Sequence, residues 1–297
     1  MSAIKKVLLV VNPISGGIDK SGIIELLEEK LKQLDLELVL FQTSGVKDKA
    51  DLTELIQKVN PERILIAGGD GTIKLIAEII QSPSIPIGLF PAGSANGLAE
   101  NFSLPTDLNE LSNIALGNNF IEIDSISINN ELCLHISDIG LNAALIKNYE
   151  EGNIRGKLGY LIQSIPTLIK SDFPFDFTIS IGSQVYQRKA VLVGIANAKR
   201  YGTGATINPE GRFDDGKFEI LVFKSFNIPQ ILKTFQENAV LSKDFLEIFP
   251  ATQAVIQCGK KIFFQIDGEY RGEVKEVRAE ISPIKIKFAV PAHTKEH

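Results

Sequence analysis

The sequence predicts an α/β domain followed by a β-rich domain, on three observations. Strand-like and helix-like patterns alternate from the start of the chain to about residue 122, and glycine-rich loops follow several of the apolar runs. Beyond that point, short strand-like runs are separated by Gly, Asn, Asp and Pro. Alternating strands and helices are typical of a parallel sheet covered by helices, whereas closely spaced short strands indicate antiparallel pairing.

The N-terminal elements follow one another in a regular order. "KVLLVV" is expected to be a strand, "GIIELLEEKLKQL" a helix and "LELVLFQT" a second strand. The helical spacing of apolar residues returns in "KADLTELIQKV", and "RILIA", "TIKLIAEII" and "PIGLFPAG" then predict a strand, a helix and a strand. We therefore expect a first domain over residues 1–122.

The rest of the chain predicts a second domain over residues 123–285. Its expected strands are "FIEIDSISI", "ELCLHISDI", "FDFTISI", "QVYQRKAVLVGIA", "KFEILVF", "ATQAVIQC" and "KIFFQID", and "IKIKFAV" follows near the C-terminus. Two helical insertions are expected to interrupt them, at Leu158–Lys170 and at Pro229–Phe249. The second domain is thus expected to be mainly antiparallel.

Composition narrows the functional classes. The chain has 297 residues, 44% hydrophobic and 23% charged, with a formal net charge of −5 and no dense basic run. Nucleic-acid binding and purely charge-driven attachment to anionic lipid are therefore not expected. No window holds the roughly 18 apolar residues that a membrane span needs. Cys133 and Cys258 form no CxxC pattern, so neither a disulfide framework nor a thiolate zinc site is expected.

A carboxylate stands among glycines in "GGDGT", Gly68–Thr72, directly after a predicted strand. In an open parallel sheet, ligands bind beyond the carboxyl ends of the strands, and glycines there let the backbone approach a phosphate closely. Asp70 would repel phosphate unless a divalent cation lay between them, or unless the carboxylate polarised an attacking hydroxyl. The alternative is a tight turn that caps a helix.

Two further small-residue loops end predicted strands of the same domain, "NPISGG" at residues 12–17 and "PAGSAN" at residues 91–96. Three such loops at one sheet edge favour nucleotide phosphates over simple turns. The sequence has no G-x-x-x-x-G-K-S/T motif, which excludes a Walker P-loop. The first strand does not lead into G-x-G-x-x-G, which weighs against a dinucleotide-binding dehydrogenase.

Taken together, "NPISGG", "GGDGT", "PAGSAN" and the late "IDGE" resemble the motifs of the diacylglycerol kinase catalytic-domain family, bacterial lipid kinases related to sphingosine and ceramide kinases. The match covers nearly the whole chain in the family's order. The resemblance implies an ATP-binding N-terminal domain with an NAD kinase-like or phosphofructokinase-like parallel sheet, to which residues 286–297 return. It also implies a sandwich-like, β-rich lipid-substrate domain over residues 123–285.

The resemblance further implies site residues. Those expected to contact ATP are Asn12, Ser15, Gly16, Thr43, Gly69, Asp70, Gly71, Thr72 and Ser94. Glu269 and Asp267, in "IDGE", match the Asp-Gly-Glu that supplies the family's catalytic base, and Asp70 is a third catalytic candidate. Without the resemblance, an Asp-Gly pair between strand-like runs predicts a hairpin turn.

A structural magnesium site is implied by the resemblance in "NPEGRFDDGKFEILVF". Its ligands would be the carboxylate of Asp215 and the backbone carbonyls of Arg212 and Lys217, with Asp214 as an alternative carboxylate. Mg²⁺ commonly keeps several waters and takes only one or two carboxylates, so this sparse set is compatible with the ion. A plain turn is the alternative interpretation.

The chain departs from the family pattern at a few positions. Lys74 and Leu75 replace the usual Asn-Glu after GGDGT, Ser94 replaces Thr, and Gly97 stands where many members carry Asp. A lysine in the first turn of a helix opposes the helix dipole. Lys74 is hypothesised to turn toward the nucleotide phosphates, and a solvated lysine is the alternative.

The resemblance therefore predicts an ATP- and Mg²⁺-dependent kinase for a lipid hydroxyl, with diacylglycerol or a related lipid as the first candidate. The stretch "GKLGYLIQSIPTLIKSDF", with Arg155, Lys157 and Lys170 near its ends, is expected either to line a lipid entry at the bilayer surface or to lie in the core. The alternatives are an NAD kinase-like enzyme and a nucleotide-binding regulator without turnover. Cytoplasmic location, peripheral contact with the inner face of the membrane and a homodimer are further expectations.

Overall fold

The computed structural model describes residues 5–80, 85–94, 96–143, 173–200, 205–236, 240–292 and 294. The chain divides into two compact units. Unit 1 consists of Met1–Ile123 and Ile284–His297, and unit 2 consists of Asp124–Pro283.

Unit 1 is built on a parallel sheet. Its first four strands are β1 (Lys6–Val11), β2 (Glu37–Gln42), β3 (Arg63–Gly68) and β4 (Ile87–Pro91). β1 pairs with β2 and β3, and β3 pairs with β4, all in parallel register. The far end of β14 (Glu269–Ala289) adds a further parallel neighbour, because Phe288 pairs with Ile87. The alternation in the sequence predicted this sheet correctly.

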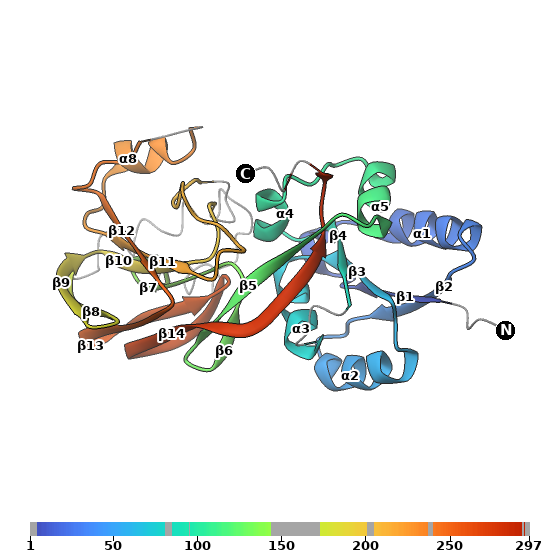
Figure 1. The fold of residues 1–297 in the computed structure, drawn as a ribbon, viewed down its shortest axis with the longest axis horizontal. Coiled ribbons are helices and arrows are strands. Elements are labelled where there is room, and N and C mark those ends of the chain that lie inside the picture. The colour runs from blue at the N-terminus through green and yellow to red at the C-terminus, as the bar shows by residue number, and fades with distance from the viewer. Residues whose placement is uncertain are drawn as a thin grey trace. The chain divides into compact units, whose positions relative to one another are not determined.

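Helices cover both faces of this sheet. They are α1 (Ser21–Gln33), α2 (Asp48–Val59), α3 (Asp70–Ile80), α4 (Gly97–Asn101) and α5 (Leu108–Leu116). In Figure 1, α1 and α5 lie on one side of the strands, and α2 and α3 lie on the other. On the first side, Leu27 and Leu31 of α1 and Leu111 of α5 belong to one buried cluster with alternate residues of β1. Burial of these apolar stripes supplies most of the driving force for the layered arrangement.

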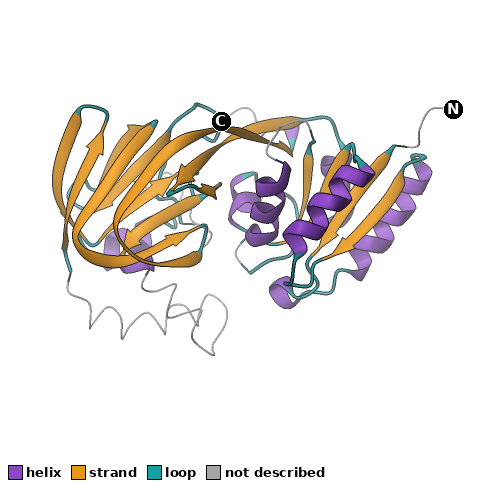
Figure 2. Ribbon diagram, turned by 90° about the horizontal axis from the view of Figure 1, so that it is seen from below, coloured by secondary structure: helices purple, strands orange, loops and turns teal. Residues whose placement is uncertain are grey.

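Unit 2 is mainly antiparallel, as its texture predicted, and strands dominate it in Figure 2. Its strands are the second half of β5 (Phe120–Ile128), β6 (Glu131–Cys133), β7 (Ile136–Gly140), β8 (Phe175–Ile181), β9 (Gln184–Ala190), β10 (Leu192–Ala196), β11 (Phe218–Phe223), β12 (Leu246–Ala251), β13 (Gln253–Ile266) and the first part of β14. The order β12-β11-β10-β7-β13-β14 forms the main path, and β8-β9 branches from β13. One apolar cluster fills the interior, with Phe177, Phe218 and Phe264 among its members.

One predicted element of unit 2 is wrong. Among the described residues of the insertion expected at Pro229–Phe249, which leave out 237–239, the helix is α8 (Ile228–Lys233), and Leu246–Ala251 forms strand β12 instead. In "LEIFPA", buried and exposed residues alternate in a manner suited to pairing with β11, and that pairing overrides the helical pattern. The other insertion, Leu158–Lys170, lies outside the described residues. Within the described part of the chain, no helix is long and apolar enough to cross a bilayer.

Candidate functional site

The three small-residue loops of unit 1 interlock at the carboxyl edge of its sheet. A Cβ on Gly16 would lie 2.6 Å from the carbonyl oxygen of Ala92, and Gly16 has a φ of +60°. A Cβ on Gly93 would lie 2.5 Å from the Cα of Gly69. Since contacts this short exclude a side chain, glycine at Gly16, Gly69 and Gly93 lets the backbones of the three loops touch. The expectation that these loops meet is correct.

Asp70 holds two of these loops together. Its carboxylate accepts hydrogen bonds from the amides of Gly97, at 2.8 Å, and Leu98, at 3.3 Å, which open α4. Asp70 is itself the first residue of α3. The negative charge thus lies at the positive ends of two helices, which stabilises both. The sequence left open whether Asp70 caps a helix or acts on a ligand. Helix capping accounts for the two hydrogen bonds that its carboxylate accepts within unit 1.

The turn after β1 is fixed by Asn12 and Lys20. The side-chain amide of Asn12 donates to Thr72 Oγ1 at 3.4 Å and accepts from the amide of Ile14 at 3.2 Å. Lys20 is only 4% exposed, and its ammonium donates to the carbonyl of Ser15 and, at 3.5 Å, to that of Pro13. Hydrogen bonds to these carbonyl oxygens offset the cost of desolvating the buried ammonium. Lys20 therefore stabilises the turn that follows β1.

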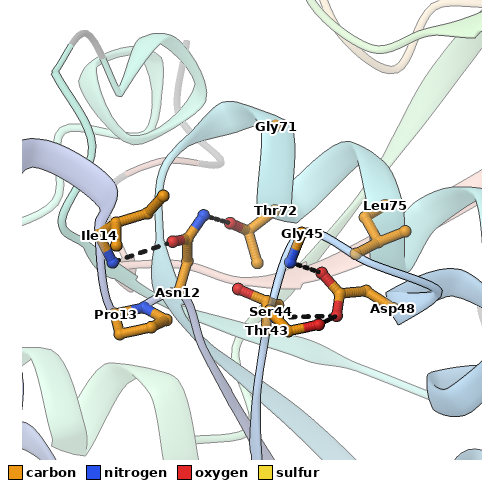
Figure 3. Close-up of a pocket in the computed structure, with 10 residues that line it drawn as sticks. All are labelled: Asn12, Pro13, Ile14, Thr43, Ser44, Gly45, Asp48, Gly71, Thr72 and Leu75. Carbon is orange, nitrogen blue, oxygen red and sulfur yellow. Dashed lines mark hydrogen bonds between the residues drawn. The ribbon is translucent and has the colours of Figure 1, made fainter.

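A pocket of about 350 Å³ opens beside these loops, entirely within unit 1 (Figure 3). The residues that line it are Asn12, Pro13, Ile14, Thr43, Ser44, Gly45, Asp48, Gly71, Thr72 and Leu75. Asn12, Thr43, Gly71 and Thr72 were predicted to contact nucleotide, and they come from three different strand ends. A concave site with apolar walls and a few backbone and side-chain donors suits a small polar ligand.

The other predicted nucleotide contacts lie in the same interlocked loops. Ser15 donates its hydroxyl to the carbonyl of Asn12 at 3.1 Å, and Ser94 is exposed in the loop after β4.

Lys74 is 4% exposed, so the alternative of a solvated lysine is wrong. From α3, the pocket receives Gly71, Thr72 and Leu75. The hypothesis that Lys74 turns toward phosphate stays a prediction.

Asp48 organises one wall of the pocket. Its carboxylate accepts from the amide of Ser44 at 2.9 Å, from the Ser44 hydroxyl at 3.0 Å and from the amide of Gly45 at 2.8 Å (Figure 3). Burial raises the pKa of Asp48, but these hydrogen bonds together outweigh that effect and leave the pKa below its ordinary value. The carboxylate is therefore an ionised anchor for the loop that follows Thr43.

In unit 2, "IDGE" forms a two-residue hairpin turn between β13 and β14. Asp267 has a φ of +51° and Gly268 a φ of +84°, and Ile266 pairs with Glu269 on either side of them. Two successive positive φ values are the signature of the tight turn that Asp-Gly favours, so the hairpin prediction is correct. The hairpin places Glu269 directly after the turn.

The carboxylate of Asp267 lies in a ring of backbone amides. It accepts from the amides of Leu134, His135 and Ile136 at 3.1, 2.9 and 3.2 Å. Cys133 Sγ contacts the same carboxylate at 3.3 Å. With these contacts on its two oxygens, Asp267 fixes the turn against the segment that enters β7.

Glu269 has a side chain that is 45% exposed. Arg271 forms ion pairs with Glu269 and with Glu131, the second at 2.7 Å. Burial lowers the pKa of Arg271, but its hydrogen bonds to the two carboxylates outweigh that effect and raise the pKa above its ordinary value. The permanently charged guanidinium orients Glu269 and leaves part of its carboxylate accessible to solvent.

The predicted magnesium loop leads into β11. Asp215 is exposed and accepts from the amide of Lys217 at 3.1 Å, while Arg212 pairs with Asp214 at 3.3 Å. Asp124 approaches the same loop from β5, with its carboxylate accepting from the amide of Gly216 at 2.7 Å. No cluster of three or more His, Cys, Asp or Glu suited to a metal occurs among the described residues. The proposed Mg²⁺ ligands remain a prediction.

Sequence reasoning missed Lys20, Asp48 and Asp124. Lys20 follows a polar, glycine-rich turn, where a lysine is normally solvated, and no pattern distinguished it. Asp48 could have been found, since an acid at the start of a predicted helix is a capping signal. Asp124 interrupts the apolar pattern of β5 and is 1% exposed, so a buried acid in a strand was its signal.

Comparison with known proteins agrees with this organisation. The diacylglycerol kinase catalytic domain matches residues 6–128, and the YegS C-terminal NAD kinase beta sandwich-like domain matches residues 137–290. A protein of Escherichia fergusonii named "Probable lipid kinase YegS" is 26% identical over 258 residues, which cover 80% of this chain and 85% of that protein. Its namesake from Shigella boydii is also 26% identical, over 75% of this chain and 76% of its own length.

Solved structures show the same fold. A crystal structure of a diacylglycerol kinase from Bacillus anthracis has a TM-score of 0.75 at 19% identity, covering 99% of this chain and 100% of its own. An NAD kinase from Archaeoglobus fulgidus in complex with ATP has a TM-score of 0.57 at 17% identity, covering 97% of this chain and 95% of its own.

The fold and the matched domains define a kinase of the NAD kinase-like structural class, with a C-terminal β-sandwich domain. The chain belongs to the diacylglycerol kinase catalytic-domain family, in the branch that carries the YegS-type C-terminal domain. It is therefore a phosphotransferase with an alcohol group as acceptor and, at the level of the family, a lipid kinase.

Proposed function

We propose that this chain transfers the γ-phosphate of ATP to the hydroxyl of diacylglycerol or of a closely related lipid. The observation that carries the proposal is the pocket of unit 1, which gathers Asn12, Thr43, Gly71 and Thr72 from three strand ends beside the interlocked glycine loops. Such a site offers backbone amides and hydroxyls rather than cationic side chains to a nucleotide. The proposal assigns ATP to this pocket, with its phosphates nearest Gly71 and Thr72.

Glu269 is proposed as the general base. Its exposed carboxylate would take the proton of the lipid hydroxyl as that oxygen bonds to the γ-phosphorus and the bond from the γ-phosphorus to the bridging oxygen breaks, releasing ADP. Arg271 would hold the carboxylate in position throughout. Asp267 and Asp70, whose carboxylates already bind backbone amides, would position their loops rather than accept the proton.

Asp215, with the carbonyls of Arg212 and Lys217, is proposed to hold Mg²⁺. The fit rests on an exposed carboxylate in a loop next to the buried carboxylate of Asp124, a donor set of hard oxygens such as Mg²⁺ prefers. When bound, the ion would link these oxygens and stabilise the loop that leads into β11.

The test is transfer of labelled γ-phosphate from ATP into detergent-dispersed lipids by the purified full chain. Diacylglycerol, monoacylglycerol, sphingosine, ceramide and undecaprenol would be compared with NAD as the soluble acceptor. We expect label in a glycerolipid, since the family and the curated relatives are lipid kinases. Label in NAD alone would favour the alternative of an NAD kinase-like enzyme. ATP binding without transfer to any acceptor would favour a nucleotide-binding regulator.

A further inference from the structure

A buried chain of hydrogen bonds leads from β7 to the turn that carries Glu269. Asp138 of β7 and Gln265 of β13 are directly paired across the two strands. Asp138 is 1% exposed and Gln265 is fully buried. Polar side chains are uncommon in the buried core of a sheet unless they form hydrogen bonds with one another or belong to a functional site.

The hydrogen bonds converge on the carboxylate of Asp138. The side-chain amide of Asn142, just after β7, donates to Asp138 Oδ2 at 2.5 Å, and Gln265 Nε2 donates to the same oxygen at 2.7 Å. The other end of the Gln265 amide, Oε1, accepts from the backbone amide of Gly268 at 2.8 Å. Ser137 adds a hydroxyl bond to the carbonyl of Gln265 at 2.6 Å.

The chain of hydrogen bonds ends at Gly268, the residue between Asp267 and Glu269. Asp267 is tied to the amides of residues 134–136 on one side of the turn, and its own amide donates to the carbonyl of Ile136 at 2.8 Å. Gly268 is tied to Gln265 on the other side. Because Gly268 has a φ of +84°, its peptide is in a conformation that needs such a restraint to stay unique.

We propose that Asp138 and Gln265 are positioning residues for catalysis, which hold the Gly268 peptide so that Glu269 leaves the turn in one orientation. Asp138 fixes which end of the Gln265 amide faces the turn, because a carboxylate accepts and cannot donate. The amide oxygen of Gln265 must then face Gly268. This inference rests on the proposed role of Glu269 as general base.

Gln265→Glu tests the proposal with almost no change in shape. Glutamate keeps an oxygen for Gly268 but replaces the amide donor to Asp138 with a carboxyl group, so the pair either repels as two carboxylates or is held by one shared proton. We expect kcat to fall by about 10- to 100-fold, since small misplacements of a catalytic group cost on that order, while the KM for ATP changes less than about twofold.

The double variant, Asp138→Asn combined with Gln265→Glu, restores the chain with its donor reversed. The new amide nitrogen at position 138 would take the place of Oδ2 and donate to the new carboxylate at position 265, and the side-chain amide of Asn142 would turn so that its oxygen accepts from the same nitrogen. The new carboxylate would still accept from the amide of Gly268. We expect this double variant to recover most of the lost kcat, a rescue that a purely structural role would not require.

Gln257→Glu is the matched control. Gln257 lies on the same strand and donates to Glu276 of β14 at 2.7 Å, so the substitution sets the same two charges against each other, away from the turn and nearer the surface. We expect its kcat to stay within about twofold of the unsubstituted chain. If Gln265→Glu does not fold, Asp138→Asn alone, which adds no charge, replaces it and is expected to lower kcat by a smaller factor.

The outcomes separate the inference from the proposed function. If Glu269→Gln abolishes transfer while folded Gln265→Glu keeps its kcat, the positioning role is wrong and the base assignment stands. If Gln265→Glu loses kcat and the double variant recovers none of it, the coupling between the two side chains is absent and the inference also fails. If Glu269→Gln itself transfers at the full rate, the base assignment fails and the positioning role fails with it.

Discussion

At the scale of single residues, the carboxylates differ in what already binds their oxygens. Asp70 and Asp267 accept backbone amides and thereby fix loops, whereas Glu269 pairs with a guanidinium and keeps an exposed side chain. The composition of the motifs could not distinguish these roles, because GGDGT and IDGE each present an acid next to glycine. The distinction comes from the amides that the fold brings to each acid.

Gly93 allows close contact between two loops, and replacing it with alanine should damage the nucleotide site. Gly93→Ala would place a Cβ 2.5 Å from the Cα of Gly69, and relieving that overlap is expected to cost about 1–3 kcal/mol of stability. We expect ATP binding, followed by calorimetry, to weaken as the loops separate. Gly22→Ala is the control, because Gly22 has open space around it. Equal ATP affinity in both variants would contradict the interlocked arrangement.

Glu219 should make the stability of unit 2 depend on pH. The side chain is 7% exposed, and burial raises its pKa above the ordinary 4.5, although a hydrogen bond from Asn208 at 2.6 Å opposes the shift. A raised pKa means that stability is greatest below the ordinary value and is lost as the pH rises through the folded-state value. Gln at this position cannot ionise.

We therefore expect Glu219→Gln to be more stable than the unsubstituted chain at pH 7, with the advantage shrinking as the pH falls toward 4.5. Urea unfolding at several pH values measures this difference. A difference that is constant with pH, or that grows toward acid, would show that Glu219 is not held as a buried acid.

At the scale of elements, the aspartates at the N-terminal ends of α2 and α5 make different contacts. Asp107 caps α5 by accepting from the amide of Glu110 at 2.8 Å, and Asp48 opens α2 while binding the loop that lines the pocket. Losing the cap of α5 costs about 1 kcal/mol of stability, and losing the hydrogen bonds of Asp48 to the loop costs a similar amount. The expected destabilisation is therefore similar for Asp48→Ala and Asp107→Ala.

ATP affinity should distinguish the two substitutions. Asp48→Ala frees the Ser44–Gly45 wall of the pocket, and we expect the Kd for ATP to rise by about tenfold, the equivalent of one well-formed hydrogen-bonded contact. Asp107→Ala, away from the pocket, should bind ATP as the unsubstituted chain does. A rise in Kd of the same size in both would mean that general destabilisation, and not the wall, sets the affinity.

At the scale of the whole molecule, most helices and strands could be predicted from the periodicity of apolar residues. Alternation of strands and helices predicted the parallel sheet of unit 1, and the "DG" between strand-like runs predicted the β13–β14 turn. The helix predicted over Pro229–Phe249 was partly wrong, because a short apolar run is compatible with the period of a helix and with that of a strand. Pairing with β11 decides in favour of a strand at β12. Local pattern alone could not supply that information.

The site was predictable where glycine and small polar residues follow strands, since chain topology brings strand ends to one edge. Asn12, Thr43, Gly71 and Thr72 do line one pocket. The buried partners were not predictable, because Lys20, Asp138 and Gln265 acquire their roles from contacts that the fold creates. Such hydrogen bonds leave no periodic signal in the sequence.

In the proposed mechanism, Glu269 takes the proton of the acceptor hydroxyl while ATP is bound in the pocket of unit 1. The direct measurement compares the rate of γ-phosphate transfer to diacylglycerol with the Kd for ATP, in the unsubstituted chain, Glu269→Gln and Glu131→Gln. Glu131 is the matched control, since it pairs with the same Arg271 and its side chain is 46% exposed, against 45% for Glu269.

We predict that Glu269→Gln lowers the transfer rate by at least about 100-fold, the usual contribution of a general base, with the Kd for ATP within about twofold. Glu131→Gln should keep both quantities. Transfer by Glu269→Gln at the rate of the unsubstituted chain, or equal losses in the two variants, would contradict the account.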